Sequence, residues 1–255
     1  MGVIGQPLRV ETGAVTDVGK VRSQNEDSFL SREDVGLWVV ADGMGGHEGG
    51  EWASAKIVEE LEQLVLPADF DAACAAIVDA IQAANASIVR QGKRRGKQMG
   101  STVVALFVRG GKFVAFWCGD SRCYLLRGGT LHRVTRDHSQ IQHMIDRGLI
   151  SAEEATGHPM SHVLARAVGV ADEVEIDSVS DEIEPGDIFL LCSDGLHGFV
   201  PEADIARLLN RGDPEGASEQ LVALTLQHGA PDNVTVISIM FTEPTLLSFS
   251  ESATA

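Results

Sequence analysis

The chain is 255 residues long, and its 44% apolar and 22% charged residues are typical of a globular protein that can bury a core. Its 37 acidic side chains outnumber 20 basic ones and give a formal net charge of −17. Because a nucleic-acid backbone requires a basic face, this balance argues against DNA or RNA as a partner. Acidity suits a protein that gathers divalent cations, although solvated surface charge explains most of these residues.

The cysteines and the N-terminus indicate the compartment. No two cysteines form a CxxC pair, so we predict free, buried thiols in a reducing compartment and no zinc site. Residues 1–9 lack the apolar core of a signal peptide. We also find no apolar run that approaches the roughly 18 residues of a membrane span. These features predict a soluble, cytoplasmic protein with no membrane partner.

The first third of the chain is predicted to contain three strands and then two helices. Strands are expected at 8–16, 27–31 and 36–41, of which the last is an apolar, buried run. A helix is expected over 48–66, with apolar side chains on one face. Apolar residues at alternating steps of three and four predict a second helix over 70–88.

The second helix runs into a basic segment at residues 93–97. Such a segment could bind phosphate. However, the C-terminal end of a helix favours cations in any protein, and we prefer that explanation from the sequence alone.

Two Gly-Gly pairs predict hairpins in the middle of the chain, because the tight turns between strands require positive φ angles. An antiparallel β-meander is therefore favoured over a βαβ arrangement. The flanking strands are expected at 101–108 and 112–118 around the first pair, and at 121–126 and 130–134 around the second.

Residues 137–170 interrupt this pattern with a polar segment that is rich in histidine and arginine and is predicted to be helical in pieces. The Ser- and Thr-rich tail at 242–255 is expected to be disordered. With no internal repeat or linker, residues 8–241 are predicted to form one domain. Between the insertion and the tail we expect strands at 173–180 and 187–192, helices at 201–211 and 214–228, and a last strand at 233–241.

Four aspartates share one context, next to an apolar strand and beside small residues. Strand ends in a packed sheet can converge on one edge, where clustered carboxylates repel one another unless a cation lies among them. An all-oxygen set favours Mg²⁺ or Mn²⁺ over zinc. One Asp-Gly pair alone would indicate only a turn, but four acids placed alike favour a metal site. They are Asp42, Asp120, Asp194 and Asp232.

Seven short motifs now carry a resemblance to a known family. In chain order they are 16–27 (TDVGKVRSQNED), 40–47 (VADGMGGH), 99–102 (MGST), 118–122 (CGDSR), 135–139 (TRDHS), 192–196 (CSDGL) and 231–235 (PDNVT). The chain resembles the PPM family, the type 2C metal-dependent protein phosphatases, in its compact bacterial form. The resemblance covers about residues 8–241.

The resemblance implies an α+β fold, an α-β-β-α sandwich of two antiparallel sheets packed face to face with helices outside. It also implies that the polar segment at 137–170 is a helical flap beside the active site. We interpret this flap as a substrate-docking element, although a lid of mobile polar helices would fit equally well. Its prominent polar residues are His138, His158, His162 and Arg166.

Metal-binding roles follow from the matching positions. Asp42 would bridge two metals, with the Gly43 carbonyl on one of them, and Asp194 and Asp232 would complete the other. Asp120 together with Asp194 matches a third, weaker metal position. Two divalent ions roughly 3.5–4 Å apart can share a water, lower its pKa and direct it at phosphorus.

Three further positions near the metals match the family. Glu26 and Asp27 match an acidic pair, with Glu26 acting through water and Asp27 as a further candidate ligand. Arg22 matches the phosphate-binding arginine, whose planar guanidinium can hold two phosphate oxygens. Without the motif, the sequence would indicate only a solvated charge at Arg22.

The general acid is the weakest part of the match. Many eukaryotic relatives place a histidine directly after the Asp-Gly pair, where this chain has Met44. His47 lies three residues further on and is the candidate proton donor. A helix N-terminus would lower its pKa and weaken it as an acid, so a structural histidine, with water as the proton donor, is an equal alternative.

The resemblance implies an enzyme that hydrolyses phosphoserine and phosphothreonine on proteins by direct attack of a metal-bridging hydroxide. It would use two or three Mn²⁺ or Mg²⁺ ions, act as a monomer in signal transduction, and oppose a Ser/Thr kinase. A catalytically inactive binding module is disfavoured because the metal acids are present. A small phosphomonoester hydrolase is the other alternative, but the sequence has no added cap domain to enclose a small substrate.

Overall fold

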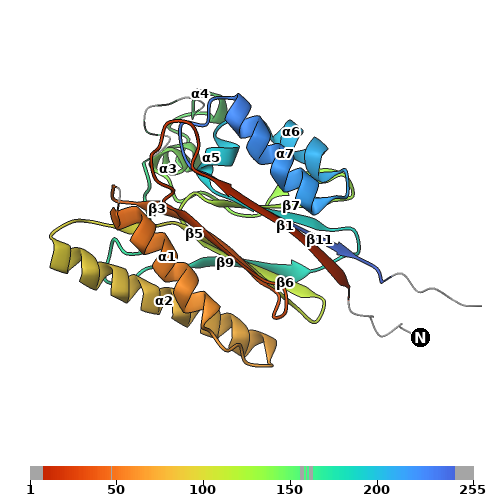
Figure 1. Cartoon of the computed structure of the whole chain (residues 1–255), viewed down its shortest axis with the longest axis horizontal. Coiled ribbons are helices and arrows are strands. Elements are labelled where there is room, and N and C mark those ends of the chain that lie inside the picture. The colour runs from red at the N-terminus through yellow and green to blue at the C-terminus, as the bar shows by residue number, and fades with distance from the viewer. Residues whose placement is uncertain (1–7, 47, 156–157, 159, 161–162, 245–255) are drawn as a thin grey trace, which may run out of the picture.

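Two antiparallel β-sheets pack face to face between two layers of helices in the computed structural model (Figure 1). The structure describes residues 8–46, 48–155, 158, 160 and 163–244. This is the α-β-β-α sandwich expected from the resemblance. The extent of the single domain, predicted as residues 8–241, stays a prediction, and the tail residues 245–255 lie outside the described residues.

The first sheet has the strand order β2-β3-β5-β6-β9, with the short β4 paired to β3. All its pairs are antiparallel. Its strands are β2 (Asp27–Arg32), β3 (Leu37–Met44), β4 (Gly100–Ser101), β5 (Val103–Arg109), β6 (Lys112–Cys118) and β9 (Asp177–Glu182).

The second sheet has the order β1-β11-β10-β7-β8, again antiparallel throughout. The first and last strands of the fold, β1 and β11, pair along their whole length. Its strands are β1 (Arg9–Asp17), β7 (Arg122–Arg127), β8 (Thr130–Arg133), β10 (Ile188–Cys192) and β11 (Val234–Thr242).

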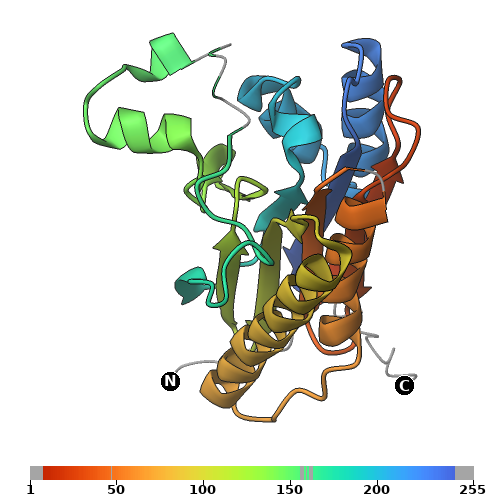
Figure 2. The same cartoon turned by 90° about the vertical axis from the view of Figure 1, so that its left-hand side faces the viewer.

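Each helical layer covers the outer face of one sheet (Figure 1). Helices α1 and α2 pack on the first sheet, and α5, α6 and α7 pack on the second. Figure 2 shows α3 and α4, in green, projecting to one side of the sandwich within the flap. The helices are α1 (Glu48–Glu62), α2 (Phe70–Arg95), α3 (Gln140–Asp146), α4 (Ala152–Ala155), α5 (Asp194–His197), α6 (Glu202–Leu209) and α7 (Pro214–Gln227).

Strand β3 shows how the sequence produces three layers of core. Successive side chains of a strand point to opposite faces of the sheet. Val39 and Ala41 therefore enter the core beneath α1 and α2, while Trp38 and Val40 enter the core between the sheets. All four are fully buried, which explains why this strand is apolar without alternation.

The middle hairpins correct one sequence prediction. We expected one continuous meander, but β5 and β6 belong to the first sheet, and β7 and β8 belong to the second. The chain crosses between the sheets at residues 119–121. Gly119 has a φ of +113°, and a Cβ there would lie 2.6 Å from the side chain of Thr102. Only glycine fits this crossing, which sets Asp120 between the sheets.

Helix α2 corrects a second prediction. We expected no apolar run of membrane-spanning length, yet this helix of 26 residues is long and apolar enough by length and composition. Its side chains at Ile77, Ile81 and Ile88 are fully buried in the core against the first sheet. A core helix of a globular domain has this composition, so the apolarity of α2 follows from its packing.

The cysteines agree largely with the prediction. All four are free thiols, and Cys118, Cys123 and Cys192 are buried in apolar strands. Cys74 is only half-buried and packs against the edge of the core beneath α2. Burial raises the pKa of the Cys118 and Cys192 thiols to about 12, so both stay protonated at neutral pH.

Candidate active site

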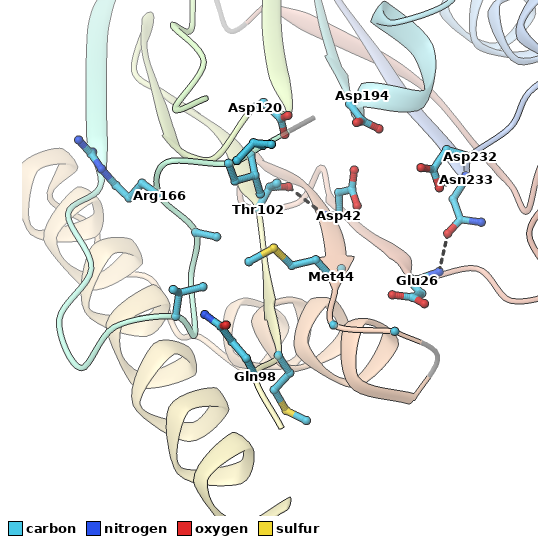
Figure 3. A pocket seen from close by; sticks show the side chains of 18 of the residues that line it. Glu26, Asp42, Met44, Gln98, Thr102, Asp120, Arg166, Asp194, Asp232 and Asn233 are labelled. Atoms are coloured by element: carbon cyan, nitrogen blue, oxygen red, sulfur yellow. Dashed lines mark hydrogen bonds between the residues drawn. The ribbon is translucent and has the colours of Figure 1, made fainter. Parts of the chain in front are cut away.

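A cavity of about 830 Å³ opens where the two sheets meet, and the four predicted aspartates all line it (Figure 3). Asp42 lies near the end of β3, and Asp120 lies at the crossing between the sheets. Asp194 begins α5, and Asp232 lies two residues before β11. Gly43, Glu26 and Arg22 line the same cavity. The structure thus brings four aspartates that are up to 190 positions apart in sequence to one place.

The backbone of Asp42 is fixed on both sides by the adjoining β4–β5 segment. Its N–H donates to the Thr102 hydroxyl at 3.0 Å, and its carbonyl accepts from the Thr102 N–H at 2.8 Å. The Ser101 hydroxyl donates to the same carbonyl at 2.9 Å. The carboxylate therefore projects from a rigid support. Burial, followed by the charge of Asp27, raises the pKa of Asp42 well above its usual value.

Asp27 differs from the other acids, because it does not line the cavity. It is opposite Asp42 in the β2–β3 register and only 8% exposed. The hydroxyls of Ser193 and Thr235 each donate to its Oδ2 at 2.8 Å. Burial raises the pKa of Asp27 to about 7, although both hydrogen bonds oppose this shift. Because β2 and these hydroxyls belong to different sheets, Asp27 links the two sheets beneath the cavity.

Asp120 is also buried, with 7% of its surface exposed. Burial, together with the charges of Asp194 and Asp137, raises its pKa to about 8. Its backbone carbonyl lies 3.0 Å from Nε2 of His197. His197 is held at this carbonyl, and burial lowers the pKa of its imidazole to about 4.

Asn233 holds the loop that carries the residues before β2. Its side-chain amide donates to the carbonyls of Val18 and Gln24 at 2.9 Å each. Its Oδ1 accepts from the Glu26 N–H at 2.8 Å. A Cβ on Gly195 would lie 1.9 Å from the Asn233 carbonyl, so only glycine permits this contact. These contacts place Glu26 and Arg22 at the cavity.

Arg22 reaches the cavity from this loop. Its Nη2 donates to Oδ2 of Asp232 at 2.7 Å. The hydrogen bond and charge of Asp232 raise the pKa of Arg22 further above its usual value. The Arg22 side chain is 54% exposed, so a guanidinium with free space around it stands at the edge of the acid cluster. This arrangement can hold an anion against the acids.

The donor set fits divalent cations. The cavity is lined by carboxylates and carbonyl or hydroxyl oxygens, and within residues 8–46, 48–155 and 163–244 it has no histidine or cysteine. Oxygen donors of this kind suit Mg²⁺ or Mn²⁺. Across the described residues, no three acidic, histidine or cysteine side chains stand close enough to hold an ion as they are. Burial, and then the charges of neighbouring acids, raise the pKa values of Asp42 and Asp120, so a bound cation would stabilise their ionised forms.

Arg166, from the flap, lines the cavity. His138 does not line it and instead supports the backbone next to it. Nδ1 of His138 accepts from the Gly119 N–H at 3.2 Å, and Nε2 lies 3.2 Å from Asp177. Arg166 also binds Asp177, at 2.5 Å. His158 accepts from the backbone N–H of Met160. The candidate acid His47 and the flap residue His162 lie outside the described residues.

Sequence reasoning missed the residues that hold the acids, although they lie in the quoted motifs. Thr102, Ser193, Asn233 and Thr235 hold Asp42, Asp27 and the loop that carries Glu26. The available signal was a buried hydroxyl or amide next to each candidate acid. Without the fold, that signal does not say which acid each group contacts.

Comparison with known proteins decides the family. The family model described as Protein phosphatase 2C matches residues 20–225. The chain belongs to the protein phosphatase 2C family.

Named relatives agree with this assignment. The chain is 37% identical over 232 residues to the serine/threonine protein phosphatase PstP of Mycobacterium tuberculosis, covering 90% of this chain and 45% of that protein. It thus spans about half the length of this relative. It is 33% identical over 237 residues to the serine/threonine phosphatase stp of Listeria welshimeri, covering 88% of this chain and 93% of that protein.

A solved structure supports the fold of this protein phosphatase 2C domain. The catalytic domain of PstP in complex with two manganese ions matches with a TM-score of 0.82 and 35% identity. The match covers 92% of this chain and all of that one.

In the metal-free protein, raising the pH from 5 to 8 is expected to lower the midpoint of thermal unfolding. The pKa values of Asp27 and Asp120 are about 7 and about 8 when folded, above their unfolded value of 3.8. The unfolded chain therefore releases these protons first, and stability is lost as the pH rises from about 4 toward about 8. Calorimetry in EDTA measures the midpoint.

The −17 charge acts in the same direction, so a matched variant separates the two causes. Asp120→Asn should flatten the pH dependence, whereas Glu33→Gln, which removes one exposed acid, should leave it almost unchanged. Equal slopes in the two variants would contradict the assignment to the buried carboxylates.

Proposed function

We propose that this chain removes phosphate from phosphoserine and phosphothreonine in proteins. The observation that carries the proposal is the convergence of Asp42, Asp120, Asp194 and Asp232 on one open cavity with Arg22 at its edge. The names of the relatives support the substrate class.

Within the cavity we assign unequal roles to the acids. Asp42, on its rigid support, would be the ligand shared by two cations, with the Gly43 carbonyl beside it. Asp194 and Asp232 would hold one ion, Asp120 with Asp194 would hold a third, and Glu26 would act through water. The carboxylate of Asp27 accepts hydrogen bonds from two hydroxyls. We therefore propose that Asp27 supports Asp42 and does not contact an ion directly. Bound cations would lower the pKa of a water molecule and polarise the phosphoryl oxygens.

The remaining residues bind and orient the phosphate. Arg22 donates two parallel N–H groups to phosphoryl oxygens and exchanges its contact with Asp232 for the substrate. No histidine among the described residues lines the cavity. The proton for the leaving oxygen therefore comes from water or from His47, and an unchanged pH profile in His47→Ala would assign it to water.

The wider setting belongs to the same proposal. We infer that the protein acts in the cytoplasm as a monomer, in signal transduction, and opposes a Ser/Thr kinase. The open cavity supports a phosphoprotein substrate, because a segment of a protein can enter it.

Phosphopeptides test the substrate class. With Mn²⁺, the purified chain is expected to release phosphate from phosphothreonine and phosphoserine peptides with a kcat/KM at least about tenfold above that for glucose 6-phosphate. The open cavity contacts a peptide backbone but cannot enclose a small substrate, and lost contacts lower kcat/KM. Phosphate release is measured in a coupled assay. Equal or better turnover of the sugar phosphate would contradict a protein substrate.

A further inference from the structure

Basic side chains gather at the C-terminal end of α2, outside the acid-lined cavity. Five of the chain's 20 Lys and Arg residues fall between positions 90 and 97, in a protein with a net charge of −17. All five are exposed. We call them the basic strip: Arg90, Lys93, Arg94, Arg95 and Lys97.

Part of the strip lines a hollow of its own. Arg90, Lys93 and Arg94 surround a depression of about 450 Å³ together with Asp172. Residues three and four apart lie on one face of a helix, so these three side chains present their charges together. The depression gives a ligand more contact than a flat surface would.

The strip leads directly to the active site. Helix α2 ends at Gly96, whose φ of 62° turns the chain, and Lys97 follows. The next two residues, Gln98 and Met99, line the catalytic cavity. Figure 3 shows Gln98 beside Met44, on the side of the cavity opposite Asp120 and Asp194. A segment leaving the cavity past Gln98 would meet Lys97 and then α2.

The acids around the strip leave it positive. Lys93 pairs with Asp172 at 2.7 Å, and Arg95 lies 3.8 Å from Glu48. Exposed pairs of this kind contribute little and exchange readily for another anion. The C-terminal end of α2 favours cations in its last turn only. Arg90 lies before that turn and Lys97 beyond it, so the helix end does not explain the whole strip.

We propose that the basic strip binds acidic side chains that flank the phosphorylated residue of a protein substrate. This inference rests on the proposed function and adds the class of sequence that the enzyme prefers. The catalytic cavity itself repels acidic segments, and the strip offsets this repulsion on one side. From Arg90 to Arg95 the helix rises about 7.5 Å, the length of two to three extended residues.

The strip should affect binding and leave the chemical step unchanged. Its contacts to flanking acids are the same before and during phosphate transfer, and uniform binding of this kind lowers KM without changing kcat. Contacts between exposed charges are also screened by salt. The preference for acidic peptides should therefore disappear at high ionic strength.

The test compares two phosphothreonine peptides, one flanked by Asp and Glu on both sides and the other by Gln and Ser. The double variant Arg94→Gln/Lys97→Gln is expected to raise KM for the acidic peptide about five- to tenfold, the effect of losing two exposed charge contacts. Its kcat should stay unchanged. KM for the peptide flanked by Gln and Ser should change less than about twofold, and so should turnover of para-nitrophenyl phosphate.

The matched control removes two exposed charges on the opposite helical layer, Arg207→Gln/Arg211→Gln. The proposed role of the basic strip would be contradicted if KM for the acidic peptide rose equally in both double variants, or in neither. An equal rise in KM for the two peptides would also contradict it. Arg90→Gln/Lys93→Gln is the second variant and should reproduce the effect. Failure of the wild-type chain to hydrolyse any phosphopeptide with Mn²⁺ would refute the proposed function instead.

Discussion

Asp42→Asn is expected to lower phosphate release with Mn²⁺ by at least about 10³-fold, which corresponds to about 4 kcal/mol of transition-state stabilisation. The neutral amide keeps the shape of the side chain but cannot be shared between two cations as a carboxylate can. Asp194→Asn should have a comparable effect. The measurement is kcat for para-nitrophenyl phosphate at saturating Mn²⁺, and EDTA should abolish the activity of the wild-type chain.

Stability provides the control for this loss. Because burial and neighbouring acids raise the pKa of Asp42, removing its charge should leave the metal-free fold as stable as before, or more stable. Calorimetry should therefore show an unchanged or higher midpoint, while titration calorimetry shows weaker Mn²⁺ binding. A fully active Asp42→Asn enzyme, or wild-type activity that survives EDTA, would contradict the metal site.

Arg22→Ala is expected to lower kcat/KM by about 10²- to 10³-fold, the effect typical of removing one preorganised donor from a developing anion. The guanidinium stands at the edge of the acids through its 2.7 Å contact with Asp232, with space for a phosphate. Arg22→Lys should recover only part of the loss, because an ammonium cannot form two parallel bonds to the phosphate. Steady-state kinetics with a phosphopeptide measure both variants.

Lys20→Ala is the matched control, since it removes an exposed cation from the same loop. Its kinetics should stay within about twofold of wild type if binding geometry, and not local charge, is the cause. Equal losses in Lys20→Ala and Arg22→Ala would assign the effect to the electrostatic potential of the loop. Binding of Mn²⁺ to Arg22→Ala should be retained, because Asp232 then loses only a competing cation.

The sequence predicted most elements because each has a local signal. The apolar run at 36–41 and the apolar spacing after residue 70 correspond to β3 and α2. The pairing of strands has no such signal. Two similar Gly-Gly hairpins fall in different sheets, because the chain crosses at Gly119, whose requirement for a positive φ appears only once Thr102 packs against it. The sandwich itself followed from the family resemblance.

For the candidate site, the sequence identified the acids but not their supports. Asp42, Asp194 and Asp232 were recognisable from strand ends beside small residues. Asp27 was a candidate ligand only through the family motif, paired with Glu26. Its partners Ser193 and Thr235 lie 166 and 208 positions away, and no local pattern relates residues at that separation. Contacts of this kind depend on how one sheet is seated on the other.

The packing of one sheet on the other determines how the enzyme can lose activity. Asp42 extends from the first sheet, while Asp194 and Asp232 flank strands of the second, and Asp27 fastens one sheet to the other. Edge-to-face contacts such as Trp38 with Phe241 and Phe113 with Phe189 set the distance between the sheets. Catalysis therefore depends on how the two sheets are aligned with each other. A substitution in the core that shifts one sheet relative to the other by a fraction of an ångström would abolish activity, while each sheet and its helices remained folded.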